Sequence, residues 1–432
     1  MLFFIGLTAL ALSLGVRAIG QRFGLEMLLS VETYGVTFGA IILGGVLLSF
    51  LLHHRIFRGI RYFVRHWLIQ SRLERQLIDA RYYLERGNCL VLPEIRITLN
   101  KNLKIGVIKI RNMIKFDKKL DGIDISAALG RYVVERHYLS DDSNIHIYEI
   151  VDASISYRLR FPSIATFIKH MDSVNPYTLF LDARSVARLQ SLLLCGMTGS
   201  GKTYALYSLV LQLLNSDVQC VIYFCDPKGS SLAVLGSIVD KPRTAIKPNE
   251  IMSLLERFVS DMQVRKQELA EKLKTKLDAD YSTFGFSPNT MIIDEYATFA
   301  TLLAAEDKKT RDKVKSLIYE IVLEGRQLGF FLFIVMQKSD ATLIDTALRD
   351  NLPLKIVLGN AEQQTYVTAF GSGVEIPNRN YGQGEGVFTE PTIAPKPKLV
   401  QFPTLDFDIL DAVKQRSGGD VITPAPEKWK VE

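Results

Sequence analysis

The feature that most constrains this chain is a glycine-rich string of eight residues that satisfies the pattern GxxxxGK[ST]: Gly196-Met197-Thr198-Gly199-Ser200-Gly201-Lys202-Thr203. It follows a short apolar run, Leu192–Leu194, and opens a stretch of helical character, Lys202–Leu214. A loop between a strand and a helix N-terminus holds phosphate groups with its backbone N–H groups. We therefore predict a nucleotide-binding loop in which Lys202 bridges the β- and γ-phosphates and the Thr203 hydroxyl binds Mg²⁺. We also predict that the next residue, Tyr204, contributes to nucleotide binding.

A second motif supplies the acids that such a site needs. The apolar run Met291–Ile293 ends in Asp294 and Glu295, about 90 residues after the glycine-rich loop. Two acids at the end of a core strand are typical of a Walker B motif. We expect Asp294 to hold Mg²⁺ through water and Glu295 to polarise the attacking water. The competing interpretation is a pair of helix N-capping residues.

Three further polar positions follow predicted strands or helices. Gln337 ends the apolar run Phe330–Met336 and is expected to contact the γ-phosphate or the water, the alternative being an ordinary polar residue at the end of a strand. Arg326, at the end of a helical stretch, is either a residue that stabilises transition-state charge in a neighbouring subunit or an ordinary C-terminal helix cation. The string Asp226-Pro-Lys228-Gly229-Ser follows another strand, and is either part of the ligand edge of the sheet or a structural turn.

The apolar pattern predicts an α/β fold with a parallel central sheet. From residue 188 to 415, short apolar runs alternate with longer helical stretches, as buried parallel strands and crossover helices do. The five runs are Ser191–Cys195, Val218–Cys225, Thr290–Ile293, Phe330–Met336 and Leu354–Leu358. We assign 87–187 to a small α+β connector domain, with strands in its β-branched segments and a helix near Ala127–Tyr138. Residues 416–432 form a Gly-, Pro- and charge-rich tail that we expect to be mobile.

The N-terminal 54 residues predict a membrane anchor of two transmembrane helices. Residues 34–52 contain no charge over nineteen positions, which at about 1.5 Å per residue is close to a hydrocarbon core. Residues 1–16 are also uncharged and predict a first, slightly short span. Gly35 and Gly39 have the GxxxG spacing that lets two membrane helices approach closely, but the favoured interpretation is that these glycines are simply tolerated in lipid.

The positive charge is concentrated directly after the second span. Residues 53–86 contain eight arginines against three acids, which is +5 of the formal net charge of +6. We predict one basic amphipathic helix over 55–86, whose arginines contact anionic headgroups or, less favoured, DNA. The positive-inside bias places this flank and the domains after it in the cytoplasm, with a multi-pass membrane anchor. The large domain carries almost no net charge, so its charge alone gives no argument for nucleic-acid binding.

The four cysteines indicate a reduced compartment. Cys89, Cys195, Cys220 and Cys225 form no CxxC pair and no metal-type spacing with histidine. We expect free, mostly buried thiols in a cytosolic domain.

Five strings in order resemble the FtsK/SpoIIIE-type DNA translocases: GMTGSGKT, DPKGS, IIDEYA, EGRQLGFFLFIVMQ and LRDN, over about 190–370. With the N-terminal spans and the connector, the chain looks most like the TcpA-type coupling proteins of Gram-positive conjugative elements. The resemblance implies a RecA-like motor, assembled as a hexamer around DNA and driven by ATP with Mg²⁺. It implies Lys202 and Thr203 at phosphate and Mg²⁺, Asp294 and Glu295 as the Walker B pair, Arg326 as a finger acting in trans and Gln337 as a γ-phosphate sensor.

The function expected from this resemblance is delivery of processed DNA to a type IV secretion channel, with a relaxase–DNA complex and channel components as partners. Two features differ from the chromosome translocases: a longer segment between Asp294 and Arg326, and no apparent winged-helix reader after about residue 400. The alternatives are a chromosome translocase, an ATPase that drives protein secretion, and a scaffold that binds nucleotide without turnover. The presence of both Lys202 and Glu295 argues against the scaffold.

Overall fold

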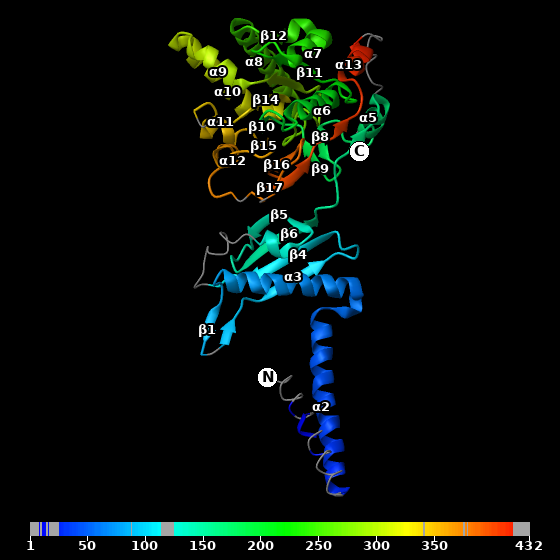
Figure 1. Cartoon of the computed structure of the whole chain (residues 1–432). Coiled ribbons are helices and arrows are strands. Elements are labelled where there is room, and N and C mark those ends of the chain that lie inside the picture. The colour runs from blue at the N-terminus through cyan, green and yellow to red at the C-terminus, as the bar shows by residue number, and fades with distance from the viewer. Residues whose placement is uncertain are drawn as a thin grey trace. The chain divides into compact units, whose positions relative to one another are not determined.

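The computed structural model describes residues 26–87, 89–113, 125–339, 342–374, 376–377 and 379–417, together with residues 8, 11–13 and 16. These residues divide into two compact units (Figure 1). The first unit ends at Ala153, and the second begins at Ser154 and also takes residues 135–137. Most of the predicted first span, 1–16, and of the predicted tail, 416–432, lies outside the described residues.

The first unit begins with a long apolar helix, α2 (Glu26–His53). Its segment Val36–His53 has a mean hydropathy of 2.1 and is 6% buried, and it is the one described helix long and apolar enough to cross a membrane. The predicted second span, 34–52, therefore lies within a helix of the expected length and character. Two spans and a multi-pass topology stay predictions, because most of the first span lies outside the described residues.

The basic segment after α2 is not one helix. It consists of a short 3-10 turn, η1 (Ile56–Arg58), then the helix α3 (Ile60–Asp79) and a strand, β1 (Leu84–Arg86). Gly59, with φ of 104°, breaks the chain direction before α3, and Arg81, with φ of 55°, reverses it afterwards. The predicted helix over 55–86 is therefore too long at both ends, because positive φ values do not continue an α-helix.

A four-stranded sheet forms the rest of the first unit, in the order β3-β4-β6-β5. Its core joins α3 to the sheet through buried residues such as Leu73, Leu77, Ile108 and Ile150. The elements are β2 (Cys89–Val91), which pairs with β1 as a hairpin, β3 (Ile95–Leu99), β4 (Ile105–Arg111), α4 (Ser126–Leu129), β5 (Tyr132–Leu139) and β6 (Ile145–Asp152). The α+β composition agrees with the sequence prediction.

One helix predicted in this unit is wrong. The segment Ala127–Tyr138 is helical only to Leu129 and continues as strand β5. Gly130, with φ of 64°, ends the short helix, and the aromatic and β-branched residues Tyr132, Val133 and Val134 then favour an extended chain.

The second unit is built on an eight-stranded sheet in the order β12-β11-β13-β14-β10-β15-β16-β17. The first six strands are parallel, and β16 and β17 are antiparallel additions at one edge. The strands are β10 (Leu192–Gly196), β11 (Val221–Cys225), β12 (Thr244–Ala245), β13 (Asn289–Ile293), β14 (Phe330–Met336), β15 (Leu354–Leu358), β16 (Glu385–Glu390) and β17 (Ala394–Gln401). The predicted α/β fold with a parallel core is confirmed, and the sheet as a whole is mixed.

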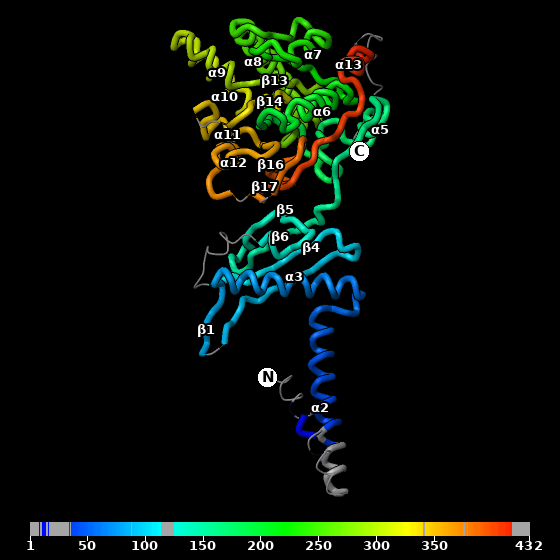
Figure 2. Tube along the Cα trace, viewed as in Figure 1, coloured from blue at the N-terminus to red at the C-terminus, as the bar shows by residue number. Residues whose placement is uncertain are grey.

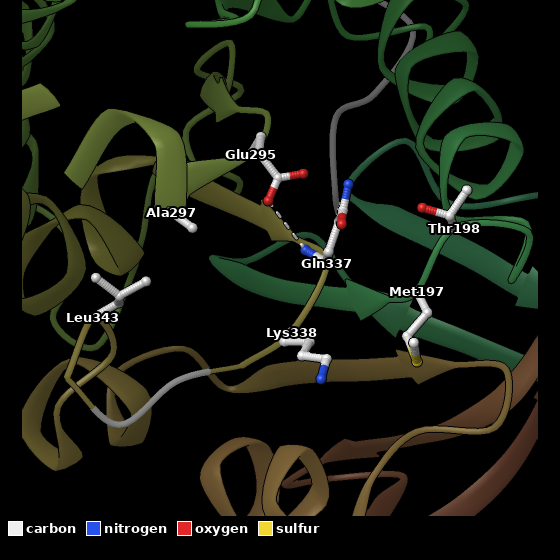
Figure 3. A pocket seen from close by; sticks show the side chains of 7 residues that line it. All are labelled: Met197, Thr198, Glu295, Ala297, Gln337, Lys338 and Leu343. Atoms are coloured by element: carbon white, nitrogen blue, oxygen red, sulfur yellow. Dashed lines mark hydrogen bonds between the residues drawn. The ribbon is translucent and has the colours of Figure 1, made fainter. Parts of the chain in front are cut away.

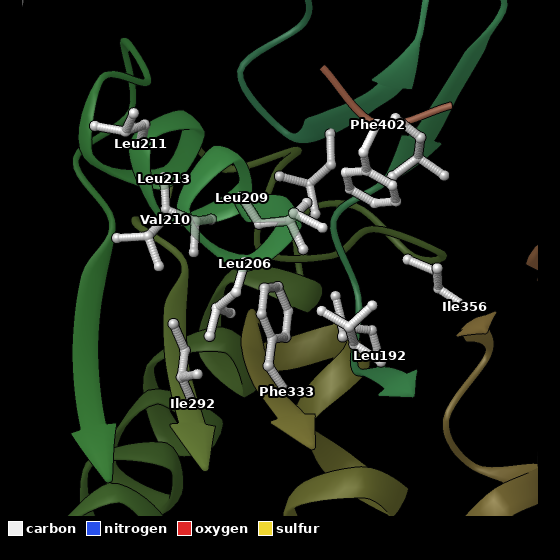
Figure 4. Close-up of a cluster of buried hydrophobic side chains, with 14 of the residues drawn as sticks. Leu192, Leu206, Leu209, Val210, Leu211, Leu213, Ile292, Phe333, Ile356 and Phe402 are labelled. Carbon is white, nitrogen blue, oxygen red and sulfur yellow. The ribbon is translucent and has the colours of Figure 1, made fainter. Parts of the chain in front are cut away.

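Helices cover both faces of this sheet, which explains why its central strands are apolar throughout. Alternate residues of β14, such as Phe331 and Phe333, share a core with leucines of α6 (Figure 4). On the opposite face, Phe258 contacts the rings of Tyr223 and Phe330. The helices are α6 (Lys202–Leu214), α7 (Ser231–Asp240), η4 (Lys241–Arg243), α8 (Pro248–Leu273), α9 (Tyr296–Ala304), α10 (Lys308–Leu328), α11 (Thr346–Asp350), α12 (Gln363–Phe370) and α13 (Ile409–Ser417).

The second unit begins well before the predicted boundary at residue 188. Phe161, Phe167 and Phe180 are buried in the same core as α6 and the central strands. They belong to β7 (Arg160–Phe161), α5 (Ile164–Met171) and β8 (Thr178–Asp182), which pairs with β9 (Ser185–Arg188). Strand β7 also pairs with β18 (Thr404–Leu405), so the start and the end of this unit lie side by side (Figure 2). Residues 154–187 therefore pack with the large sheet rather than with the connector.

The cysteines are free, as expected from their spacing. Burial raises the pKa of the Cys195, Cys220 and Cys225 thiols to about 12, so these three are inert at neutral pH. Cys89 is exposed.

Candidate active site

The predicted site residues converge on the carboxyl edge of the parallel sheet. The glycine-rich loop follows β10, the Asp226 turn follows β11, the acid pair follows β13 and Gln337 follows β14. All four strands run parallel, so these segments leave the sheet at the same edge, where open α/β sheets bind ligands. Strand β14 lies between β10 and β13, which places Gln337 between the loop and the acids.

The glycine-rich loop has the backbone that its glycines predict. Gly199 and Gly201 have φ of 85° and 89°, and Gly201 caps the N-terminus of α6. A Cβ at Gly196 would lie 2.4 Å from Oγ of Ser200, so the turn closes too tightly for any side chain there. Met197, Thr198 and Gly199 are exposed, so the loop's outer rim is accessible to a ligand.

Residues far along the chain hold the loop from behind. The Gly384 N–H donates to the Ser200 carbonyl oxygen at 2.7 Å. A Cβ on Gly201 would come within 2.4 Å of the Gly384 nitrogen, and one on Gly359 within 2.8 Å of the Ser200 Cβ. The turns after β15 and before β16 therefore support the loop, a role that the sequence motifs did not indicate.

Lys202 and Glu295 lie within reach of each other. The Lys202 Nζ is 3.5 Å from Oε2 of Glu295, and both side chains are largely buried. The loop lysine and the glutamate after β13 thus meet at one place, as a site that combines phosphate binding with the activation of water requires. This juxtaposition, from residues 93 positions apart, could not be measured from sequence.

Asp294 and Glu295 are fixed by their backbone. The Asp294 N–H donates to the Cys225 carbonyl at 2.9 Å, and the Glu295 N–H donates to Oδ1 of Asp294 at 3.0 Å. Glu295 has the left-handed backbone of φ 52° and ψ 58°, sparsely populated for a side chain that is not glycine. Burial raises the pKa of Asp294, while the nearby Lys202 ammonium opposes that shift. Burial disfavours the charged form of this carboxylate, so a bound cation would stabilise it.

Gln337 begins immediately where β14 ends, and its side chain lies between Glu295 and Thr198 (Figure 3). Its backbone N–H donates to Oε1 of Glu295 at 3.4 Å. These residues line a cleft of about 340 Å³ with Met197, Ala297, Lys338 and Leu343. The cleft lies beside the loop rim and gives water access to the glutamate.

The donor groups fit Mg²⁺ bound together with a nucleotide. The described residues contain no group of three or more His, Cys, Asp or Glu side chains that could hold a metal ion by themselves. Mg²⁺ at phosphate sites is usually held by one or two protein oxygens, substrate phosphates and water. The Asp294 carboxylate and the exposed Thr203 at the first turn of α6 supply such oxygens.

The Asp226 turn combines both interpretations that its sequence left open. Asp226 is buried and accepts hydrogen bonds from the N–H groups of Lys228, Ser230 and Ala233, so it stabilises the turn that leads into α7. Lys228 instead reaches into the site, where its Nζ lies 3.3 Å from Oε2 of Glu295. Its position after a core strand indicated that Lys228 could lie at the ligand edge of the sheet. Nothing in the sequence indicated that it would approach Glu295.

Two predicted residues lie apart from this cluster. Arg326 is exposed in the last turn of α10, and none of its described contacts joins it to the loop or the acids. Tyr204 is 53% exposed on the first turn of α6, and its ring contacts Tyr207. The neighbouring Gly325 is required by packing, because a Cβ there would lie 2.1 Å from the Phe330 carbonyl oxygen. The roles of Arg326 and Tyr204 stay predictions.

Comparisons with known proteins agree with the resemblance. Residues 162–340 match the model of the FtsK/SpoIIIE family. The FtsK domain-containing protein YdcQ of Bacillus subtilis is 31% identical over 186 residues, which are 43% of this chain and 37% of YdcQ. The DNA translocase FtsK of Staphylococcus epidermidis is 25% identical over 201 residues, which are 42% of this chain and 24% of that protein. The chain thus spans well under two thirds of these relatives.

Solved structures also resemble the chain. The pCW3 conjugation coupling protein TcpA, in a monomer form with ATPγS, has a TM-score of 0.48 and 16% identity and covers 81% of this chain and 99% of that chain. EssC from Geobacillus thermodenitrificans, ATPases 2 and 3, has a TM-score of 0.43 and 16% identity over 61% of this chain and 51% of that chain.

Proposed function

We propose that this chain, whose residues 162–340 form a P-loop ATPase domain of the FtsK/SpoIIIE family, is a membrane-anchored motor that uses ATP hydrolysis to move DNA. The observation that carries the proposal is the approach of Lys202 to Glu295 at 3.5 Å, beside a phosphate-type loop and at the edge where Asp294 and Gln337 also emerge. This arrangement combines phosphate binding with groups that activate water, which a binding scaffold does not need.

The geometry suggests how this chain's residues would act on ATP. The N–H groups of the loop and of the α6 N-terminus bind the phosphates. The Lys202 ammonium, which lies beside Glu295 in this structure, would turn to the β- and γ-phosphate oxygens, and Lys228 would then be the lysine that stays beside the glutamate as it orients water. Gln337 lies between Glu295 and Thr198, where it contacts the γ-phosphate or that water. Mg²⁺, held near Thr203 and Asp294, would neutralise the charge that develops on the phosphates.

DNA is the proposed substrate because the family model and the named FtsK relatives point to it. An exposed Arg326, with no described contact to Asp294 or Glu295, is compatible with a finger that completes the site of a neighbouring subunit in a hexameric ring. We therefore keep the hexamer and the trans role of Arg326 as parts of the proposal.

The finer proposal is a coupling protein that passes a relaxase–DNA complex to a type IV secretion channel. Its support is the order along the chain of an apolar helix, a small α+β domain and an FtsK/SpoIIIE domain, which resembles the TcpA type. The arginine-rich flank after α2 favours a cytoplasmic position for both domains. A chromosome translocase is the second candidate, favoured by the similarity to the FtsK proteins.

The test is ATP turnover by the full chain in lipid nanodiscs, with and without single- or double-stranded DNA. Strong stimulation by DNA supports a translocase, and turnover without any response to DNA contradicts it. Displacement of a third strand from a DNA triplex then measures translocation directly. Transfer of a conjugative element that carries the gene, complemented by the wild type or by Lys202→Ala, distinguishes the coupling role from chromosome segregation.

A further inference from the structure

Helix α3 has two apolar faces. One face is buried against the sheet of its own unit and includes Tyr62, Ile69, Leu73 and Leu77. The other face carries five large apolar side chains, whose successive spacings of four, three, one and ten residues place them within about 100° of one another around the helix, so that they form one stripe. Their exposed fractions are Ile60 71%, Val64 41%, Trp67 40%, Leu68 39% and Ile78 38%. A stripe of this size on a helix that is already packed needs a second environment.

The bilayer is the environment that this stripe meets first. Only six residues separate the end of α2 at His53 from the start of α3 at Ile60. The end of α2 also packs on α3: the Phe50 and Phe63 rings are 5.9 Å apart, and Nδ1 of His54 is 3.0 Å from Nδ1 of His66. If α2 crosses the membrane, α3 is held at its surface.

The charges beside the stripe match an anionic surface. Arg61 and Arg72 are exposed along one edge of the stripe, together with Asp79, and the exposed Arg75 lies within the stripe itself, from where its long side chain can reach the headgroups. Each arginine within a Debye length of an anionic bilayer strengthens attachment about fivefold. Interfacial helices combine such a basic flank with an apolar face that contains tryptophan.

The β1–β2 hairpin extends the same pattern. Leu90 and Val91 are 51% and 38% exposed, Arg86 is exposed on the paired strand, and Arg81 is exposed shortly before the hairpin. In Figure 1 the hairpin and α2 leave the first unit on the same side, and α3 lies between them and the sheet.

We propose that α3 lies flat in the interface of an anionic bilayer, with Ile60, Val64, Trp67, Leu68 and Ile78 inserted at the boundary of headgroups and acyl chains. One face of the helix then contacts lipid, and the opposite face packs on the four-stranded sheet of the first unit. It fixes the base of the cytoplasmic part on the membrane in addition to the single described span. The proposal is independent of ATP hydrolysis and of DNA.

Trp67 provides a direct probe. The sequence has two tryptophans, Trp67 and Trp429, so the full chain with Trp429→Phe reports Trp67 alone. We expect its emission to be shifted to the blue, quenched by brominated acyl chains and shielded from acrylamide in bilayers that contain phosphatidylglycerol. Weaker bromine quenching is expected in pure phosphatidylcholine, and equal quenching in both bilayers would contradict the role of the arginines.

The matched variants separate insertion from folding. In the same background, Val64→Glu with Leu68→Glu places charge on the stripe, and both positions are exposed, so folding of the unit should be unaffected. The expected result is loss of bromine quenching and gain of acrylamide quenching. Ile105→Glu, an exposed apolar residue on β4, is the control and should behave as the parent. A Trp67 shielded from both quenchers would show that protein, such as a second copy, covers the stripe, and a Trp67 open to water would show that nothing does; either result overturns the proposal.

Discussion

Lys228 and Lys202 approach the same oxygen of Glu295, at 3.3 Å and 3.5 Å. Lys202 belongs to the glycine-rich loop, so we expect it to contact phosphate when a nucleotide binds. Lys228 is not part of the loop, and its side chain is 46% exposed at the edge of the sheet. In the nucleotide-bound enzyme Lys228 would therefore be the cation that still holds the catalytic carboxylate away from water.

Lys228→Ala should raise basal ATP turnover. A carboxylate released from an ion pair is a stronger base and is free to turn toward water. Because a half-exposed ion pair contributes little, we expect an increase of about two- to fivefold in kcat. Steady-state kinetics of the full chain without DNA measures this, and KM for ATP should stay unchanged.

Lys228→Arg keeps the charge and is the control, with turnover near that of the wild type. A lower kcat in Lys228→Ala would instead make Lys228 a supporter of catalysis. A raised KM would place it on the nucleotide. Both results would contradict a restraining role.

Lys202→Ala and Glu295→Gln should both abolish hydrolysis, for different reasons. The first removes the charge that binds the phosphates, and the second keeps the shape but removes the base. We expect turnover to fall about 10²- to 10⁴-fold in Glu295→Gln, while a fluorescent ATP analogue still binds. Unimpaired turnover in either variant would mean that the site lies elsewhere.

Regular elements of the large sheet were predictable because their signals are local. Phe330–Met336 and Leu354–Leu358 are strands with the predicted bounds, since fully buried strands are continuous apolar runs between polar turns. The segment Ala127–Tyr138 failed because a glycine with positive φ divides it, and that conformation is decided by the fold. The start of the second unit was placed too late, since only tertiary packing puts Phe161 and Phe167 in the core beneath α6.

The motif residues that gather at the carboxyl edge of the sheet were predictable, but their electrostatic partners were not. Motif spacing singled out Lys202, Thr203, Asp294 and Glu295 as candidates, because phosphate and metal binding require those side chains in a fixed local context. The pairing of Lys228 with Glu295 depends on which strands are neighbours, and β11 and β13 meet only in the folded sheet. The support of the loop by Gly384 likewise comes from the turn before β16, 184 residues after Ser200.

Arg326→Ala should abolish ATP turnover only through assembly. The guanidinium is exposed on α10, and none of its described contacts is with Asp294 or Glu295. We therefore expect it to act on the nucleotide of a neighbouring subunit. ATP binding by the variant should be normal. Mixing Arg326→Ala with Lys202→Ala subunits should restore part of the activity, because some interfaces then combine an intact arginine with an intact loop. No restoration at any mixing ratio, with mixed rings verified by crosslinking, would place the arginine in cis or in a structural role.

The first unit, which contains α3 and the four-stranded sheet, should lose stability as the pH falls from about 6.5 to about 4. His66 is buried beside His54, and burial, followed by the charges of His54 and Arg55, lowers the pKa of His66 to about 4. The unfolded chain takes up this proton near pH 6.5 and the folded chain only near pH 4, so protons favour unfolding within that window. Below it both states are protonated and the loss stops. Thermal unfolding followed by Trp67 in the Trp429→Phe background should show this slope, and His66→Gln should flatten it. His137→Gln, on β5 and outside the pair, should keep the slope; an unchanged slope in His66→Gln would assign the pH dependence to other groups.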